Sequence, residues 1–309
     1  MRAISRGGHL VAAMVAALLL GACQTVPPPE LARSRPEALL DVPFVAQEDY
    51  QCGPAALAMM LRWNHEPGDA EALVEEVWLP KRHGSLGIEL MAAGRARGLL
   101  AYPVGTPDAL IGEVQAGHPV LILQNLAFTH WPKWHYAVVI GYDQAGQRVI
   151  LHSGTRAATH SPWNRFLRTW ARAHYWGFVL LPPGQLPASV APEPLLQALA
   201  PMHQNALAHW RAAVHRFPDN GRLRFGYANA LWEAGQRQAA LSAYQRAVKL
   251  TPRLAPAWNN LAYARAESGD PQGAIHAVCH ARALAPDNDN IAASVTELTG
   301  GQGCPARAP

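Results

Sequence analysis

A 34-residue repetition constrains the fold of this 309-residue chain more than any other feature of its sequence. A shift of 34 residues superimposes several pairs of identical residues in the C-terminal third, and six of them mark the repeating pattern. These pairs are Ala228 and Ala262, Gly235 and Gly269, Ala240 and Ala274, Ala247 and Ala281, Leu250 and Leu284, and Pro252 and Pro286. Small residues at fixed points let two helices pack closely, Gly supports the turn between them, and Pro ends each unit. The repetition therefore predicts stacked pairs of antiparallel helices, which we favour over a generic Ala-rich helical bundle.

The repeated units resemble tetratricopeptide repeats, with good copies at residues 221–254 and 255–288 and a degenerate copy before them. The second copy matches the repeat pattern at Trp258, Leu261, Ala262, Gly269, Ala274, Ala281 and Pro286. The first copy departs from it, because Arg224 stands where the pattern has Trp. The resemblance implies an all-α repeat domain over residues 195–300, followed by a tail over 301–309. Such arrays present a concave groove, so we expect a protein or peptide partner there.

Composition and charge limit the classes of protein to which the rest of the chain can belong. With 50% hydrophobic residues the chain is too apolar to be disordered, and its length allows about two domains. The formal charge of +4 is spread out without a run of Lys and Arg, so we expect no nucleic-acid partner. A Pro-rich stretch over residues 184–194 predicts a linker between the repeats and an upstream domain over residues 41–183.

The upstream domain contains a cysteine in a position that favours reactivity. Cys52 is followed by Gly53 and Pro54 and then by the apolar stretch Ala55–Trp63, which predicts a buried helix that begins at the cysteine. Unpaired N–H groups and the dipole at a helix N-terminus stabilise a thiolate, so we expect the pKa of Cys52 to be lowered. Gln47 lies five residues earlier, in a loop from which its amide could face a developing oxyanion.

Buried strands follow this helix, and one of them begins at a histidine. The predicted strands are His118–Gln124, His135–Asp143, Gln147–His152 and Tyr175–Leu181. Their short hairpin-type connections make the sheet antiparallel. His135 is the candidate base for Cys52. We therefore expect an α+β domain with the cysteine on a helix and the histidine on an antiparallel sheet, as in papain-like folds.

Two segments carry a resemblance to a peptidase family: Q-E-D-Y-Q-C-G-P-A-A-L-A-M from Gln47, and W-H-Y-A-V-V-I-G-Y-D from Trp134. Together they resemble the papain-like domain of the bacteriocin-processing cysteine peptidases, in particular the stand-alone relatives that lack a transporter. The resemblance covers residues 41–183. It implies that Cys52 is the nucleophile, His135 the general base and acid, and Gln47 an oxyanion donor. Peptide-bond cleavage through an acyl-enzyme follows, and no metal or organic cofactor is implied.

The sequence departs from that family at the residue that orients the histidine. The family usually places an Asp at the end of the strand after the His, whereas here that strand ends Leu151-His152-Ser153-Gly154. Ser153 or a backbone carbonyl is the expected replacement, and Asp143 is a weaker one. Two alternatives therefore stay open. One is a peptide-binding or assembly scaffold with weak or no catalysis, and the other is a thiol-dependent acyl or peptidyl transferase.

Other candidate residues are assigned more coarsely. Trp131 and Trp134 come just before His135 and are candidates for lining a substrate groove. Neither H-E-x-x-H nor C-x-x-C occurs, so we expect no metal site. Cys279 and Cys304 are either a disulfide, in an oxidising compartment, or two free buried thiols.

The N-terminus predicts export and lipid anchoring. Residues 1–22 combine a basic start with an apolar run too short to span a bilayer, as in a secretory signal peptide. The exit L-G-A-C resembles the lipobox of bacterial lipoproteins, which implies cleavage before Cys23 and acylation of that cysteine. Residues 23–40 are then expected to form a Pro-rich tether. Gln24 favours the outer membrane, with the protein facing the periplasm, over the inner membrane.

Overall fold

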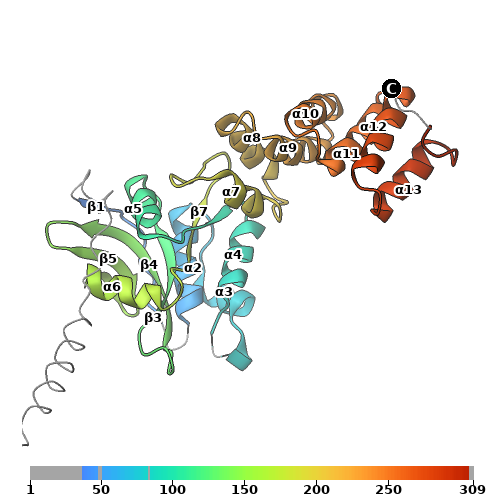
Figure 1. Cartoon of the computed structure of the whole chain (residues 1–309). Helices are drawn as coiled ribbons and strands as arrows, with labels where there is room; N and C mark the ends of the chain where they lie inside the picture. Colours follow the sequence, from blue (N-terminus) through green and yellow to red (C-terminus); the bar gives the residue numbers. More distant parts are fainter. Residues whose placement is uncertain (1–36, 48–50, 83, 306–309) are drawn as a thin grey trace, which may run out of the picture.

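The computed structural model describes residues 37–47, 51–82 and 84–305, so the expected signal peptide and Cys23 lie outside the described residues. The chain forms an N-terminal α+β part and a C-terminal array of helices (Figure 1). This is the fold class that the sequence predicts. Within the described residues, no helix is both long and apolar enough to cross a membrane.

An antiparallel sheet forms the centre of the N-terminal part. Its strands follow the order β2-β7-β3-β4-β5-β6, and β1 pairs with β4 outside this path. The strands are β1 (Glu37–Leu39), β2 (Leu100–Pro103), β3 (Val120–Asn125), β4 (Trp134–Asp143), β5 (Arg148–Ser153), β6 (Arg156–Pro162) and β7 (Gly177–Leu181). His135 is the second residue of β4 and pairs with Gln124 of β3. Its backbone is therefore fixed inside the sheet.

Helices pack on both faces of this sheet. They are α2 (Cys52–Trp63), α3 (Ala70–Val77), α4 (Gly87–Ala96), α5 (Pro107–Gln115) and α6 (Trp163–Ala171). Tyr136 and Val138 of β4 join the core formed with α2, α3 and α4, whereas Ala137 and Val139 join the core that includes α5 and α6. A strand buried on both faces needs apolar residues in succession, which is why β4 reads A-V-V-I in the sequence.

Three strands differ from the sequence-based expectation. The predicted tether over residues 23–40 is wrong in its last part, because Glu37–Leu39 form β1 and pair with Asp143, Tyr142 and Gly141. Three residues are too few to show a strand pattern. The strand β6 has the sequence R-A-A-T-H-S-P and is largely exposed, so it lacks the apolar alternation that marks a half-buried strand. The short strand β2 also escaped prediction.

The C-terminal part consists of helices packed in antiparallel pairs. They are α7 (Pro192–Leu199), α8 (Ala206–Arg216), α9 (Gly221–Glu233), α10 (Arg237–Leu250), α11 (Ala255–Glu267), α12 (Pro271–Leu284) and α13 (Asp289–Leu298). The predicted copies 221–254 and 255–288 contain the pairs α9–α10 and α11–α12. Gly235 and Gly269 close the turns within these pairs with φ of +72° and +83°, a conformation that favours glycine.

The predicted linker over residues 184–194 is tied to the sheet domain. The helix α7 begins inside it, at Pro192, and packs against β2. The backbone N–H of Ala191 donates to the hydroxyl of Tyr102 on β2 at 3.0 Å. One apolar core runs from Tyr102 through Leu195 of α7 to Trp210 of α8. The two parts of the chain therefore share a core across the segment expected to separate them.

Candidate active site

Cys52 is the first residue of α2, as the Cys-Gly-Pro sequence predicts. The following residues, Gly53 to Leu61, are all buried, and α2 packs against β4. The thiol is half-buried and is the free cysteine of the described residues. The backbone N–H groups of Tyr136, Gly53 and Cys52 itself stabilise its charged form. The helix thus holds the sulfur next to β4, beside the residue that follows His135.

Burial raises the pKa of the Cys52 thiol above its usual value, although the three backbone N–H groups lower it in part. The expectation of a lowered pKa is therefore wrong for the protein without substrate. The sequence argument counted the N–H groups of the helix N-terminus and left out the loss of water around the sulfur. Desolvation penalises a thiolate more than these donors compensate for it.

His135 is held by the residue that the sequence offers in place of the missing Asp. Its Nε2 lies 2.8 Å from Oγ of Ser153, at the end of β5. This contact leaves Nδ1 as the ring nitrogen available for proton transfer. Burial lowers the pKa of His135, and the positive charge of Lys133 lowers it further. The imidazole therefore stays neutral to a lower pH than an exposed histidine does.

Gln47 connects the cysteine side of the site to the histidine side. Its side chain is 7% exposed. Its Nε2 donates to the carbonyl oxygen of Tyr136 at 3.3 Å, and its Oε1 accepts from the backbone N–H of Gly154 at 3.0 Å. The second Nε2 hydrogen is not used by these two bonds. Among the described residues this second N–H has no hydrogen-bond partner, so Gln47 is a fixed amide with one N–H able to meet a developing negative charge.

The contacts of Gln47, Ser153, Gly154 and His135 close into a ring through the backbone of Tyr136, and Cys52 is joined to this ring by one contact. The thiol of Cys52 meets the N–H of Tyr136, the carbonyl of Tyr136 meets Gln47, and Gln47 meets Gly154. Ser153, the neighbour of Gly154, then contacts His135, which precedes Tyr136. Residues far apart in the sequence are thus brought together by α2, β4 and the β5–β6 turn.

Two family models match the chain, one for each of its parts. A model of the Peptidase_C39-like family matches residues 39–177, and a tetratricopeptide-repeat model matches residues 203–255 and 228–289. The chain contains a C39-like peptidase domain followed by tetratricopeptide repeats. No curated protein matches the chain.

Solved structures are similar to each of these two parts at low identity. A C39-like peptidase from Bacillus anthracis is 20% identical, with a TM-score of 0.39, over 47% of this chain and 97% of that one. A double glycine motif protease from an AMS/PCAT transporter, solved with the leader peptide, is 20% identical, with a TM-score of 0.37, over 47% and 94%. MamA is 21% identical, with a TM-score of 0.32, over 36% and 68%. None of these likenesses carries a functional conclusion.

Asp143, the weaker candidate for orienting the histidine, lies elsewhere in the C39-like domain. It ends β4, eight residues after His135, which corresponds to about 26 Å of strand. Its Oδ1 accepts from the backbone N–H of Gly146 at 2.9 Å and so closes the β4–β5 turn. Ser153, not Asp143, is the side chain in contact with the ring.

Sequence reasoning missed the part that Tyr136 and Ser85 have in the site. The backbone of Tyr136 contacts both Cys52 and Gln47, and its hydroxyl donates to the carbonyl of Ser85 at 3.2 Å. Burial raises the pKa of Tyr136, and the nearby thiol adds to this effect, so the phenol stays neutral. A Cβ on Gly53 would lie 2.6 Å from the hydroxyl of Ser85. Glycine after the cysteine therefore lets this loop pack on the helix start, a contact that no residue pattern reveals.

Trp131 and Trp134 were candidates for lining a substrate groove next to His135. Trp131 and Trp134 are both exposed rather than enclosed in a groove. Trp134 is adjacent to His135 at the start of β4, and Trp131 lies in the loop before it.

Within the part of the chain that the structure describes, no group of three or more His, Cys, Asp or Glu side chains is placed to hold a metal ion.

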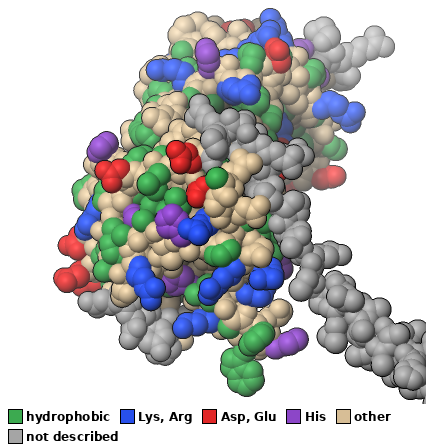
Figure 2. All heavy atoms as spheres, turned by 90° about the vertical axis from the view of Figure 1, so that its left-hand side faces the viewer, with side chains coloured by type: hydrophobic (Ala, Val, Ile, Leu, Met, Phe, Trp, Pro, Cys, Tyr) green, Lys and Arg blue, Asp and Glu red, His purple; other side chains and the backbone are tan. Residues whose placement is uncertain are grey.

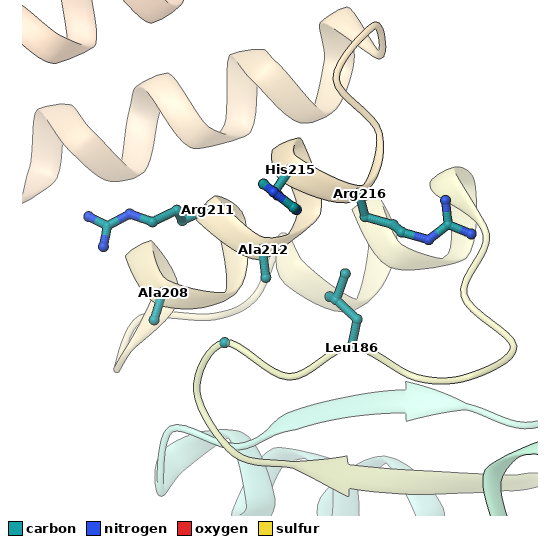
Figure 3. A pocket seen from close by; sticks show the side chains of 7 residues that line it. Leu186, Ala208, Arg211, Ala212, His215 and Arg216 are labelled. Carbon is teal, nitrogen blue, oxygen red and sulfur yellow. The ribbon is translucent and has the colours of Figure 1, made fainter. Parts of the chain in front are cut away.

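An open pocket of about 620 Å³ lies between the segment after β7 and α8, away from the cysteine. It is lined by Gly184, Leu186, Ala208, Arg211, Ala212, His215 and Arg216. Figure 3 shows the side chains of Arg211 and Arg216 pointing away from each other. Their charges do not converge on a common point, so this pocket does not have the geometry of an anion site.

The repeats form a second, smaller pocket of about 250 Å³ between α7, α8 and α9. Trp210, Phe225 and Asn229 are among its lining residues. The Oδ1 of Asn229 accepts hydrogen bonds from the hydroxyl of Tyr244 at 2.8 Å and from Nδ2 of Asn260 at 3.0 Å. The polar groups of neighbouring repeats are thus fixed against one another.

The other two cysteines of the described residues are paired. Cys279 of α12 and Cys304 of the tail form a disulfide, with their Cα atoms 5.5 Å apart. The bond encloses α13, which lies between them in the sequence. Of the two possibilities that the sequence leaves open, the structure has the disulfide.

Proposed function

We propose that this protein is a cysteine peptidase that hydrolyses peptide bonds through Cys52 and His135, with the repeats binding a protein or peptide partner. The network of contacts that links Gln47, Ser153 and His135, and reaches Cys52 through the N–H of Tyr136, carries this proposal. A thiol at a helix start, an imidazole on the adjoining strand, a hydroxyl beside that imidazole and a side-chain amide are the groups that such a reaction needs, which supports the proposal. A C39-like domain supports the same reaction class.

The reaction begins from a neutral thiol and a neutral imidazole. Nδ1 of His135 accepts the thiol proton as the sulfur of Cys52 attacks the peptide carbonyl. The free N–H of Gln47 and the backbone N–H of Cys52 stabilise the oxyanion that forms. The imidazolium then protonates the leaving amine, which leaves a thioester on Cys52. His135 next removes a proton from water, whose oxygen attacks the thioester and releases the acid and the thiol.

The missing carboxylate favours a second candidate function. Ser153 orients the imidazole but adds no negative charge to stabilise the imidazolium, and the pKa of the thiol is raised. Both observations are what a peptide-binding scaffold with weak or no catalysis would show. A thiol-dependent transferase would use the same residues with an amine in place of water, and only its products distinguish it.

Location belongs to the same proposal. The lipobox-like sequence around Cys23 suggests an envelope lipoprotein, anchored in the outer membrane and facing the periplasm. The disulfide between Cys279 and Cys304 supports an oxidising compartment such as the periplasm. Two independent features of the chain therefore support secretion: the lipobox-like sequence near the N-terminus and the disulfide near the C-terminus.

Peptide-library profiling tests the proposal. A chain that begins at residue 30 keeps every described element and lacks Cys23. We expect it to cleave a subset of peptides, Cys52→Ala to be inactive, and His135→Ala to be slower by at least about a hundredfold. His160→Ala, on the exposed strand β6, is the matched control and should cleave like wild type. No cleavage by wild type would favour the scaffold, and products joined to an added amine would favour the transferase.

A further inference from the structure

Large apolar side chains are exposed at one end of the sheet, in the loop between β3 and β4. Phe128 is 78% exposed and Trp131 is 83% exposed, and Leu126 and Trp134 at the base of the loop are also exposed. In Figure 1 this loop projects below the sheet. We call Phe128 and Trp131 the aromatic tip. Exposed aromatic residues at the end of a projecting loop are unusual on a surface that contacts only water.

The loop is held in this shape by buried polar contacts. Asn125 is buried, and its Oδ1 accepts from the backbone N–H groups of Ala127 at 3.1 Å and Lys133 at 3.0 Å. The N–H of Leu126 donates to the carbonyl of Lys133 at 2.9 Å, and Nε of Arg172 donates to the carbonyl of Asn125 at 3.1 Å. The aromatic tip is therefore presented by a built hairpin, and its exposure is a feature of the fold.

Positive charge surrounds the base of this loop. Between residues 114 and 192, Asp143 is the only acidic residue of the sequence, and it lies at the opposite end of β4. The same stretch contains Lys133, Arg156, Arg165, Arg168 and Arg172, and also Arg148, which lies with Asp143 at that opposite end. None of these basic side chains forms an ion pair within the described residues. Figure 2 shows hydrophobic side chains and a histidine standing out from the lower edge of the molecule, beneath a row of Lys and Arg side chains.

We infer that the aromatic tip inserts into the interface of an anionic lipid bilayer. Trp and Phe favour the boundary between headgroups and acyl chains, and Lys and Arg are attracted to anionic headgroups. In a convex tip with basic residues at its base, the aromatic side chains can reach the acyl-chain boundary while the basic side chains stay at the level of the anionic headgroups. A peptide substrate would instead be taken up in a groove or pocket lined by the apolar groups. The inference concerns the peptidase domain itself and does not depend on acylation of Cys23.

Membrane contact at this place has a consequence for catalysis, which rests on the proposed function. Trp134 at the base of the loop is the neighbour of His135, so the tip and the candidate active site lie at the same end of β4. A tip in the bilayer interface holds the cysteine and histidine close to the membrane surface. The substrates are then polypeptide segments exposed at that surface.

Vesicle binding tests the inference without any need for catalysis. The chain from residue 30 is mixed with vesicles of phosphatidylglycerol and phosphatidylcholine in equal parts, or of phosphatidylcholine alone, and sedimented. We expect binding to the anionic vesicles, at least about tenfold weaker in Phe128→Ser/Trp131→Ser. Binding should also weaken in Lys133→Gln/Arg168→Gln and on the neutral vesicles. Cys52→Ala should bind like wild type, so a failed peptidase assay leaves this test intact.

The matched control is Leu39→Ser. Leu39 is 64% exposed on β1, and it pairs with Gly141 toward the opposite end of β4 from the tip. Its loss removes a similar apolar side chain and should leave vesicle binding unchanged. Thermal unfolding of each variant checks that the fold is kept. Absence of wild-type binding, or equal binding by the tip variant, would overturn the inference. A tip variant that binds vesicles like wild type but no longer cleaves soluble peptides would assign the tip to substrate binding and also overturn it.

Discussion

Cys52 and His135 are uncharged in the protein without substrate, because burial acts on both in the direction of the neutral form. Burial raises the pKa of the thiol, and it lowers the pKa of the imidazole together with Lys133. A pre-formed thiolate–imidazolium pair would need the opposite shifts. The proton is therefore transferred during attack, when the N–H groups facing the site meet a substrate oxyanion.

The pH dependence of alkylation tests this charge state. Iodoacetamide reacts with the thiolate, so a raised pKa moves the inflection of the alkylation rate of Cys52 above that of a free thiol, about 8.5. Since no charged imidazolium supports the thiolate, His135→Ala should leave this inflection nearly unchanged while it abolishes most cleavage. In the chain that begins at residue 30, Cys23 is absent and Cys279 is paired with Cys304, so the label reports on Cys52 alone.

Ser153→Asp provides the control for that experiment. A carboxylate beside Nε2 of His135 favours the imidazolium and, through it, the thiolate of Cys52. The alkylation inflection should then move to lower pH. An inflection below the free-thiol value already in wild type would contradict the neutral pair and indicate that the ion pair is present without substrate.

The residues of the candidate site could be found from the sequence only where a local pattern marked them. Cys52 and Gln47 were found by their spacing around a helix start, and His135 by its place at the start of a buried strand. The backbone contacts of Tyr136 could not be found, because they depend on how β4 meets α2. The direction of the Cys52 pKa shift was missed for the same reason, since burial of the sulfur arises from packing.

At the scale of elements, the helices and strands that could be predicted are those whose apolar residues follow a regular pattern in the sequence. β4, which is buried on both faces, was predicted to within one residue, whereas the exposed β6 shows no such pattern. The repeat helices were located by the 34-residue period. α13 follows the last good copy and has no repeated partner, so its role as the covering helix of the array comes from the structure.

The disulfide between Cys279 and Cys304 is expected to hold α13 on the array. It closes a segment with a sequence separation of 25 residues, for which loop closure corresponds to about 3 kcal/mol. Reduction should therefore increase hydrogen exchange in α13 and lower the thermal stability of the repeats, with little change in the α+β domain. Hydrogen exchange read by mass spectrometry, with and without reductant, checks this. Cys304→Ser should reproduce the effect, and equal protection of α13 in both states would contradict it.

At the scale of the whole molecule, a buried carboxylate fixes the repeats to the peptidase domain. Oε1 of Glu113 accepts hydrogen bonds from the N–H and the hydroxyl of Ser189 at 2.9 and 2.7 Å. Its Oε2 accepts from the N–H of Ala188 at 3.1 Å and lies 2.7 Å from Nδ1 of His118. Glu113 on α5 thus holds the segment that leads into α7. In addition, Nε2 of His209 on α8 contacts the carbonyl of Gly98 at 3.1 Å.

The charge of Glu113 makes this attachment dependent on pH. Burial by itself raises the pKa of the carboxyl, but the hydrogen bonds from His118, Ser189 and Ala188 outweigh it, so the pKa is lowered. A lowered pKa means that the carboxylate stabilises the fold above the pKa of an unfolded glutamate, about 4.3. This stabilisation is lost as the pH falls through the lower pKa of the folded state.

Glu113→Gln tests whether the two parts unfold together. The amide NH₂ would face donors in place of one carboxylate oxygen, so the free energy of unfolding should fall by about 3 kcal/mol. Because one core continues from β2 through α7 to α8, calorimetry should show one transition in wild type and two in the variant. Glu193→Gln is the matched control, since Glu193 is more than half exposed and pairs with Arg222, and an exposed pair contributes less than about 1 kcal/mol. A single, unshifted transition in Glu113→Gln would mean that the apolar core alone joins the repeats to the peptidase domain.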